Sequence, residues 1–437
     1  MAILIFFIAL IVEITIATYC IMTKNVQKKM RNWIRIIVFI VFIMFTFSSA
    51  IEWSLRWVLI AILLFILAAV GAVSLIRNKV NVEKYKTSRI VRKAFIMTVV
   101  FVLALAPALI FPQYTLPKET GKHEVATATY TYTDKNRIEE YSKKAENRFV
   151  NVQFWYPDNV DETYPLLVFS HGAYGIKESN TSTFTELASH GYIVVSIDHP
   201  YHSFYTASDD GTVTMVNNDY FQQFNNTNKN NIYTKEEIYG LKQKWMKVRT
   251  DDMNFVIDTI LNKSKSDSDV IYQLINRNKI GVFGHSMGGA ASVSLGRERN
   301  DISAVINIDG PMFSELTYNK ETLDFEATNK PYTTTLLNIY SDDVWKQLET
   351  ISVYSPNKAA SENFREVYTV YFQGSKHLSL TDLPLYSPIL ATILQGGKAT
   401  ADEYYVIETQ NKIIVEFFDY TLKGVGRFTS EGTYGLK

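Results

Sequence analysis

The sequence predicts a bundle of about four transmembrane helices followed by an α/β domain with a mostly parallel, doubly wound sheet. The first observation is a change near residue 112, because the residues before it form apolar runs separated by basic loops. The second is that the residues after it alternate between continuous apolar runs and helix-like segments, as in sheets covered on both faces. The third is the length of 437 residues, which exceeds one typical domain.

Four apolar runs approach the roughly 20 residues that a helix needs to cross the hydrocarbon layer. They cover residues 2–22, 33–50, 57–76 and 94–111. The first has no cleavage-type site and is followed by further apolar runs, so we interpret it as a retained helix and not as a signal peptide. Residues 1–112 are therefore predicted to form the transmembrane region and residues 113–125 a tether.

The loops between these runs predict which way the chain faces. Basic residues dominate the segments 23–35 and 77–93, where they are Lys24, Lys28, Lys29, Arg31, Arg35, Arg77, Lys79, Lys84, Lys86, Arg89, Arg92 and Lys93, against the acid Glu83. Short cytoplasmic loops carry such an excess of Lys and Arg. With four crossings, the domain after residue 112 is predicted to be extracellular, on a multi-pass protein of the cell membrane.

Composition excludes several classes of partner and cofactor. The net charge is zero, which does not support a nucleic-acid partner, and the single cysteine, Cys20, lies in the first apolar run, so the α/β domain can form no disulfide. Asp198, His199 and His202 lie close together, but three such residues on one loop are weak evidence for a metal. We expect neither a metal nor a cofactor, and the oligomeric state stays open.

Short apolar or alternating runs predict the strands of the α/β domain, which we assign to residues 126–437. Residues 127–133 and 149–156 alternate as half-buried antiparallel strands do. Continuous apolar runs predict buried strands at 165–170, 192–197, 279–283, 303–308, 335–339 and 367–372, with helices at 181–190 and 247–262. The Asn-rich, aromatic segment of about 201–247 has no regular pattern, and it is interpreted either as a lipid-binding cap or as an insert whose aromatic residues pack it down.

One motif carries the chemistry. The strand 279–283 runs into Gly284-His285-Ser286-Met287-Gly288-Gly289, and a helix of small residues follows. A G-x-S-x-G pattern between a strand and a helix is the nucleophile elbow of the α/β-hydrolase fold, in which glycines allow a sharp turn that exposes the serine. A chance Gly/Ser turn is the alternative, but it does not explain the strand and helix in register. We predict that Ser286 is a nucleophile.

A serine nucleophile needs a base, which a carboxylate orients. In this fold the order along the chain is Ser, acid, His, and of the seven histidines only His377 follows Ser286. Two places can supply the acid: Asp309 follows the strand 303–308, and Asp342 and Asp343 follow the strand 335–339. Spacing alone does not choose between them.

Several motifs occur together in a fixed order. They are Phe169-Ser170-His171-Gly172, Ala188-Ser189-His190-Gly191-Tyr192, Asp198-His199, Gly284 to Gly289, Ile308-Asp309-Gly310-Pro311-Met312-Phe313 and Gly374-Ser375-Lys376-His377. In this set the chain resembles the plasma-type platelet-activating factor acetylhydrolases over most of residues 120–425. The resemblance implies that Asp309 is the acid and that the backbone N–H groups of Met287 and Ala173 bind the oxyanion.

The chain also departs from that family, because it has Asp198-His199-Pro200 where the family has Asp or Glu, His and Arg, and because the insert differs. The preference for acetyl-glycerophospholipids is therefore not carried over. We expect a membrane-anchored serine hydrolase that cleaves carboxylic esters, such as short-chain acyl lipids or small esters, through an acyl-enzyme. Two alternatives stay open: an acyltransferase that uses the same triad, and a non-catalytic membrane sensor or assembly protein with a hydrolase-like domain.

Overall fold

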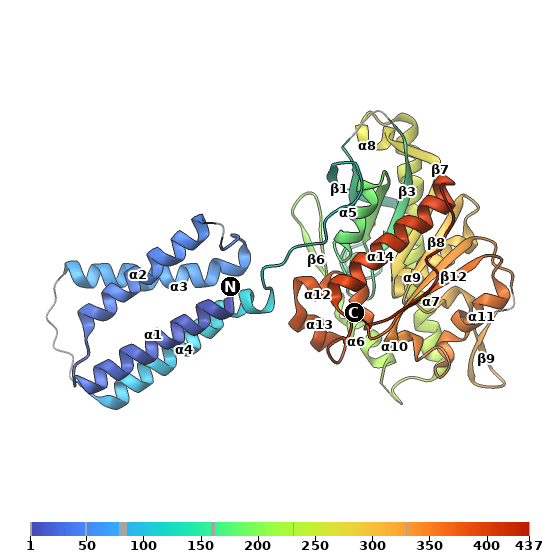
Figure 1. Cartoon of the computed structure of the whole chain (residues 1–437). Coiled ribbons are helices and arrows are strands. Elements are labelled where there is room, and N and C mark those ends of the chain that lie inside the picture. The colour runs from blue at the N-terminus through green and yellow to red at the C-terminus, as the bar shows by residue number, and fades with distance from the viewer. Residues whose placement is uncertain are drawn as a thin grey trace. The chain divides into compact units, whose positions relative to one another are not determined.

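A computed structural model of the chain describes residues 2–48, 50–77, 85–158, 162–229, 231–328 and 330–436. The chain divides into two compact units (Figure 1). The first comprises Met1–Thr115 with Leu385–Leu390, and the second comprises Leu116–Pro384 with Ala391–Lys437.

The first unit contains four helices that are long and apolar enough to cross a membrane. They are α1 (Ala2–Met22), α2 (Lys28–Phe47), α3 (Val58–Ile76), which follows the short 3-10 helix η1 (Leu55–Trp57), and α4 (Thr87–Ile110). Helices α2 and α4 begin before the apolar runs predicted to start at residues 33 and 94, because long basic side chains can be helical while their charges reach the interface. Lys79, Glu83 and Lys84 of the predicted inner loop lie outside the described residues.

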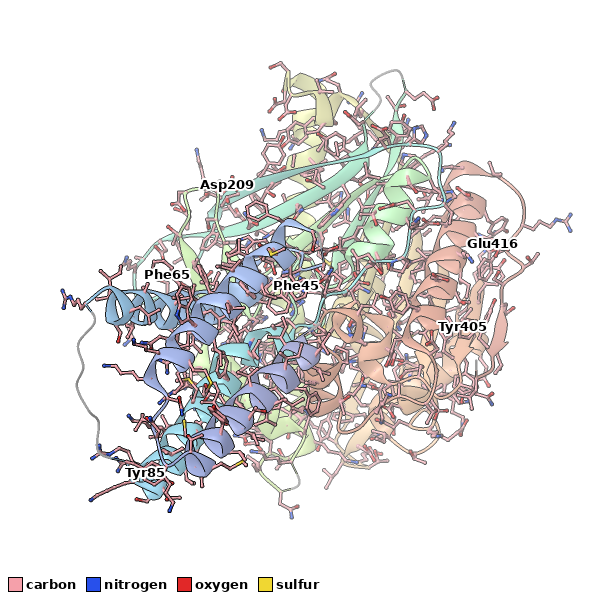
Figure 2. All side chains as sticks on the ribbon, turned by 60° about the vertical axis from the view of Figure 1, so that its left-hand side comes forward. Phe45, Phe65, Tyr85, Asp209, Tyr405 and Glu416 are labelled. Carbon is pink, nitrogen blue, oxygen red and sulfur yellow. The ribbon has the colours of Figure 1, made fainter. Side chains whose placement is uncertain are left out.

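Close packing joins these helices. Trp57, Ile60 and Leu105 are almost fully buried in a shared apolar cluster. Much of the remaining surface is apolar and exposed, as at Phe45 and Phe65 (Figure 2). Such a surface is stable in lipid but not in water.

The second unit is built on a sheet of nine strands in the order β1-β2-β4-β3-β7-β8-β11-β12-β13. Their bounds are β1 (Val125–Ile138), β2 (Asn147–Pro157), β3 (Tyr164–Ser170), β4 (Ile193–Asp198), β7 (Ile275–His285), β8 (Ile302–Ile308), β11 (Thr335–Ser341), β12 (Val367–Phe372) and β13 (Gly432–Tyr434). Strand β2 is antiparallel to β1 and β4, and all other neighbours are parallel. The predicted fold class, including its N-terminal bundle of apolar helices, is confirmed.

Helices cover both faces of this sheet. Helices α5 (Thr181–Ser189) and α14 (Glu403–Phe418) pack on one face, with α14 in front in Figure 1, and α7 (Lys235–Ser266) and α9 (Met287–Glu298) pack on the other. Alternate residues of β3 show why the strand is continuously apolar: Val168 contacts the α7 side, and Phe169 contacts the α5 side. The shorter helices are α6 (Asn218–Thr227), α8 (Val270–Gln273), α10 (Asp342–Trp345), α11 (Ser355–Asn363), α12 (Leu383–Tyr386), α13 (Pro388–Leu394), the 3-10 helices η2 (Phe313–Glu315), η3 (Ser352–Tyr354) and η4 (His377–Leu380), and the π-helix η5 (Asp419–Lys423).

The predicted insert of residues 201–247 is more regular than expected. It contains a hairpin of β5 (Tyr205–Ala207) and β6 (Val213–Met215), helix α6, and the first turns of α7. The expectation that this helix starts at 247 is wrong, because Thr234 and Glu237 form a capping box that starts it at Lys235. The hairpin of β9 (Leu316–Asn319) and β10 (Asp324–Ala327), and strand β13, were not predicted either.

Two glycines give a matched test of this packing. A Cβ at Gly288, in the first turn of α9, would lie 1.8 Å from the carbonyl oxygen of Ser170 on β3, whereas a Cβ at Gly240, an exposed position of α7, would meet nothing within 4 Å. We expect Gly288→Ala to lower the free energy of unfolding by more than about 3 kcal/mol. Gly240→Ala should instead stabilise the chain by about 0.5–1 kcal/mol. Thermal denaturation of the detergent-solubilised chain measures both, and equal melting temperatures would contradict the close contact.

Candidate active site

Ser286 lies on a strained turn between β7 and α9. Its backbone has φ 55° and ψ −119°, a conformation that residues other than glycine rarely adopt. The Ser286 N–H donates to the Ile308 carbonyl at 2.7 Å, and the Ser286 carbonyl accepts from Ala290 N–H at 3.0 Å. These bonds hold the serine at the carboxyl edge of the sheet.

The glycines of the motif permit this turn. A Cβ at Gly284 would lie 2.3 Å from the carbonyl carbon of Gly288, and one at Gly289 would lie 2.3 Å from Asn307 Oδ1. Any larger residue would push α9 away from the strands, so the spacing of the motif follows from backbone contact.

Asp309 and His377 form a pair beside this turn. His377 Nδ1 lies 2.8 Å from Asp309 Oδ2, and the carboxylate of Asp309 is fully buried. Ser341 donates to the same carboxylate from its N–H at 2.7 Å and from its hydroxyl at 2.5 Å. Because an ionised carboxylate only accepts, His377 Nδ1 carries the proton and Nε2 is left to receive one.

The alternative acids have other partners. Asp342 lies in α10 and accepts from Lys346 Nζ at 2.5 Å and from the hydroxyl of Tyr371. Burial raises the pKa of Asp342, but these two donors outweigh it and leave the pKa below its usual value. Asp343 pairs with Lys376 at 3.2 Å. The structure therefore brings Asp309, and neither of the other two acids, to His377.

His285 links the nucleophile turn to His377. The rings of His285 and His377 have centroids 4.5 Å apart, and His285 Nε2 lies 2.9 Å from the His377 carbonyl oxygen. Burial holds the pKa of His285 well below its usual value, so this ring is neutral and donates from Nε2. The hydrogen bonds of the described residues include none between Ser286 Oγ and His377, as is common in active sites without ligand.

Two backbone N–H groups lie next to Ser286. Met287 is the first residue of α9, where the helix itself supplies no acceptor. Ala173 follows His171-Gly172, and a Cβ at Gly172 would lie 3.2 Å from Ser286 Cβ, so this loop lies against the nucleophile. Within the described ranges, no hydrogen bond uses the N–H of Met287 or Ala173, and both are available to a ligand.

Asp198, His199 and His202 do not converge on a common point. Asp198 Oδ2 lies 3.1 Å from Lys177 Nζ. His199 lies 2.9 Å from both Asp252 Oδ2 and Ser170 Oγ. His202 stacks on Tyr220 with ring centroids 3.9 Å apart. No group of three or more His, Cys, Asp or Glu that could hold a metal occurs in the part of the chain that the structure describes.

Sequence reasoning missed a buried arginine at this site. Arg249, on α7, is fully buried and donates to the carbonyl oxygen of His171 at 2.6 Å and to that of Gly172 at 3.2 Å. Asp252, one turn further along α7, binds Arg148 through both of its oxygens. The apolar periodicity of a helix does not reveal which of its polar residues are buried. The one available signal was the three-residue spacing of Arg249 and Asp252, which places them on the same face of α7.

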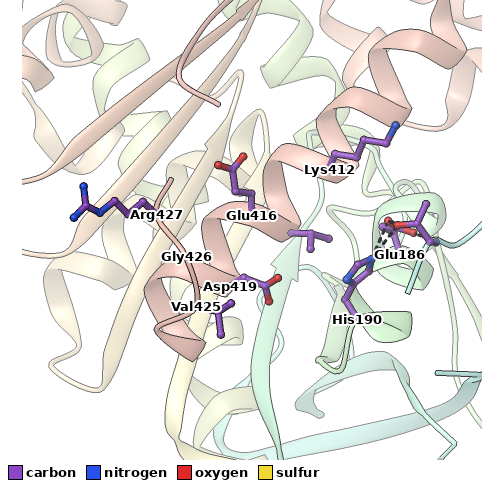
Figure 3. A pocket seen from close by; sticks show the side chains of 10 residues that line it. Glu186, His190, Lys412, Glu416, Asp419, Val425, Gly426 and Arg427 are labelled. Carbon is purple, nitrogen blue, oxygen red and sulfur yellow. Dashed lines mark hydrogen bonds and ion pairs between the residues drawn. The ribbon is translucent and has the colours of Figure 1, made fainter. Parts of the chain in front are cut away.

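A pocket of about 360 Å3 lies elsewhere in this unit (Figure 3). Glu186 Oε1 lies 3.3 Å from His190 Nε2 on one side of it, and Glu416 and Asp419 lie on the other. His190 follows α5 and precedes β4, which places this pocket toward the amino edge of the parallel strands. It contains none of Ser286, Asp309 and His377.

Asp382 fastens the His377 loop to α5 and gives a test of pH dependence. Its carboxyl accepts from the N–H and the hydroxyl of Ser182, and burial raises its pKa to about 7. The folded chain therefore keeps this proton up to pH about 7, whereas the unfolded chain loses it near pH 4. Stability should thus fall as the pH rises from about 4 to about 7, by up to about 4 kcal/mol from this group.

Asp382→Asn should remove this part of the pH dependence and leave the variant more stable than the wild type at pH 8. This difference in pH dependence is measured by the melting temperatures of the wild type and the variant between pH 4 and pH 8. Parallel curves would contradict the prediction.

Comparisons with known proteins identify the family of the second unit. Residues 116–427, more than half of the chain, match the family described as platelet-activating factor acetylhydrolase, isoform II. A platelet-activating factor acetylhydrolase of Canis lupus familiaris is 26% identical over 277 residues, which are 60% of this chain and 58% of that one. A probable 1-alkyl-2-acetylglycerophosphocholine esterase of Arthroderma benhamiae is 28% identical over 151 residues, or 35% of this chain and 32% of that one.

A solved ferulic acid esterase from Streptomyces cinnamoneus shares the fold, with a TM-score of 0.56 at 19% identity over 71% of this chain and 93% of that one. The chain covers less than two thirds of the length of the curated relatives named above. The extent of the family match nevertheless confirms the resemblance inferred from the motifs: this chain belongs to the isoform II family of platelet-activating factor acetylhydrolases.

Proposed function

We propose that the chain is a membrane-anchored serine hydrolase that cleaves carboxylic esters with Ser286, His377 and Asp309. The observation that carries this proposal is the 2.8 Å pair of His377 and Asp309 beside a serine held at φ 55°. A strained nucleophile, a base with a free nitrogen and a buried acid are the three parts that acyl transfer to a serine requires.

The proposed reaction begins when Ser286 Oγ attacks the ester carbonyl and gives its proton to His377 Nε2. The carbonyl oxygen becomes negative and accepts from Met287 and Ala173 N–H, and losing one such donor typically costs about a hundredfold to a thousandfold in rate. The alcohol leaves with the proton from Nε2, which forms the acyl-enzyme. Water then attacks the acyl carbonyl and gives a proton to Nε2, which passes it to Ser286 Oγ as the acid leaves. Asp309 stabilises the imidazolium in both halves.

The substrate class follows from the surroundings of Ser286 and from the relatives. Tyr174, which follows Ala173, packs on Phe221 and Phe224 of α6 with ring centroids 4.8 and 5.3 Å away. This apolar wall suits an acyl or alkyl group. One relative is named for a 1-alkyl-2-acetylglycerophosphocholine, so we propose short-chain acyl lipids as substrates, with small esters as the simpler possibility.

The proposed location is the outer face of the cell membrane. Helices α1 to α4 are the candidate spans, and the basic residues before and within the start of α2, such as Lys24, Lys28 and Arg31, favour the inside for that loop. Four crossings then carry residues 116–437 outside.

Labelling of intact cells tests nucleophile and orientation together. A membrane-impermeant fluorophosphonate should label the wild type and should not label Ser286→Ala. Ser294→Ala is the matched control, because Ser294 is a buried serine of the same helix that donates to Glu298, and it should label normally. Labelling that requires permeabilised cells would overturn the orientation, and no labelling of permeabilised wild-type cells would overturn the hydrolase.

A pair of substitutions tests the acid. Asp309→Asn should lower kcat for a p-nitrophenyl ester by about 10⁴-fold, because the imidazole loses the partner that fixes its tautomer. Asp342→Asn removes only a half-exposed pair and should change kcat by less than about threefold. Steady-state kinetics of the two purified variants give both kcat values. A larger loss of kcat in Asp342→Asn than in Asp309→Asn would reassign the acid to Asp342.

A further inference from the structure

Arg249 is a buried cation that makes three hydrogen bonds to the end of β3 and the loop after it, and that also interacts with Tyr220. Its guanidinium is fully buried and donates to Ser170 Oγ at 3.3 Å and to the carbonyl oxygens of His171 and Gly172. Among the described residues no carboxylate forms a salt bridge with it, whereas the neighbouring buried Arg148 pairs with both Asp252 and Glu139. Burying a charge without a charged partner is unfavourable, so a buried arginine that binds main-chain carbonyl groups requires an explanation.

The bond to Gly172 acts on a single peptide group. The carbonyl of Gly172 and the N–H of Ala173 belong to the same planar trans peptide, in which the C=O and N–H bonds point in opposite directions. Fixing the carbonyl oxygen therefore fixes the direction of the N–H. That N–H lies in the loop against Ser286 and is the donor proposed for the oxyanion.

A second donor reaches the same oxygen. His171 Nδ1 lies 2.6 Å from the Gly172 carbonyl oxygen, and Nε2 lies 2.8 Å from the hydroxyl of Ser203. Burial holds the pKa of His171 well below its usual value, so the ring is neutral, and Nδ1 carries the proton because a carbonyl only accepts. The N–H of Gly175 also donates to this oxygen at 3.1 Å, so one cation, one neutral ring and one backbone N–H hold the peptide from its carbonyl side.

We propose that Arg249 is a positioning residue that orients and polarises the Gly172–Ala173 peptide, so that the N–H of Ala173 stabilises the oxyanion of the reaction proposed above. A cation at the carbonyl oxygen withdraws electron density from the peptide and strengthens its N–H as a donor. In a buried site this effect is weakly screened, and it acts mainly on the negative transition state, because the uncharged substrate gains little from it.

Helix α6 links Arg249 to the other proposed donor. Tyr220 is fully buried and interacts electrostatically with Arg249, and its hydroxyl lies 3.6 Å from Met287 Sδ. Burial lowers the pKa of Arg249, which Tyr220 and Asp252 partly offset, and an arginine remains charged at neutral pH. Tyr220 of the insert therefore contacts both Arg249, which binds the peptide of one proposed donor, and Met287, which supplies the other.

Kinetics of Arg249→Met and Arg249→Lys test the proposal in the full-length, detergent-solubilised chain with a p-nitrophenyl ester. We expect Arg249→Met to lower kcat by about 10- to 100-fold, less than the loss of a whole donor, with KM unchanged within about threefold. A trifluoromethyl ketone, which forms a hemiketal oxyanion with the serine, should bind more weakly by the same factor. The kcat of Arg249→Lys should lie between those of the wild type and Arg249→Met, because lysine keeps the charge but lacks the planar set of guanidinium donors.

Two controls separate positioning from folding. Arg148→Lys disturbs the same buried network without touching Gly172, so it should lower the melting temperature and leave kcat within about threefold. If Arg249→Met does not fold, guanidinium ion added to Arg249→Ala should restore kcat more than sodium ion at equal ionic strength.

The proposal is overturned if folded Arg249→Met keeps both kcat and ketone affinity within about twofold of the wild type, or if guanidinium and sodium act alike on Arg249→Ala. Because the proposal rests on Ser286 as nucleophile, Ser286→Ala is measured alongside. If Ser286→Ala were as active as the wild type, the proposed function itself would be wrong. That result differs from one in which only the Arg249 variants behave like the wild type.

Discussion

The site depends on how closely the first turn of α9 approaches the ends of its neighbouring strands. Gly288 touches the end of β3, Gly289 touches Asn307 on β8, and a Cβ at Gly310 would lie 2.3 Å from the carbonyl oxygen of Ser286. Because none of these positions carries a side chain, three loops can meet within one layer of backbone. The turn at Ser286 is forced by these contacts, and Asp309 and the loop of Gly172 and Ala173 come to the serine for the same reason.

Helix α7 gives this backbone layer a rigid support. Its apolar residues, such as Met253 and Ile257, pack on the sheet, while Arg249 and Asp252 bind the segments that leave β3 and β4. Breaking a buried pair of this kind costs about 3–5 kcal/mol, so the loops have one strongly preferred arrangement. Apolar packing therefore holds α7 on the sheet, and polar contacts from the same part of the helix hold the loops.

The sequence predicted most of what depends on local pattern. The strand at 367–372 has its predicted bounds as β12, and the strand, turn and helix around Ser286 lie where the motif indicates. Order along the chain singled out His377, but the choice of Asp309 came from the resemblance, since Asp342 also follows a strand. The early start of α7 was missed although its capping box of Thr234 and Glu237 is local, because the segment before residue 247 has no regular apolar pattern. The contacts of Arg249 were not predicted, because their partners lie far along the chain.

The distribution of unfavourable features favours catalysis over a sensor or assembly role. Ser286 and Asp309 both have positive φ, at 55° and 57°, and such conformations cost about 1–3 kcal/mol each. The N–H groups of Ala173 and Met287 have no acceptor among the described residues. The proposed reaction would use both features, because the turn presents the hydroxyl of Ser286 and the two N–H groups can donate to a negatively charged oxygen on a group attached to it.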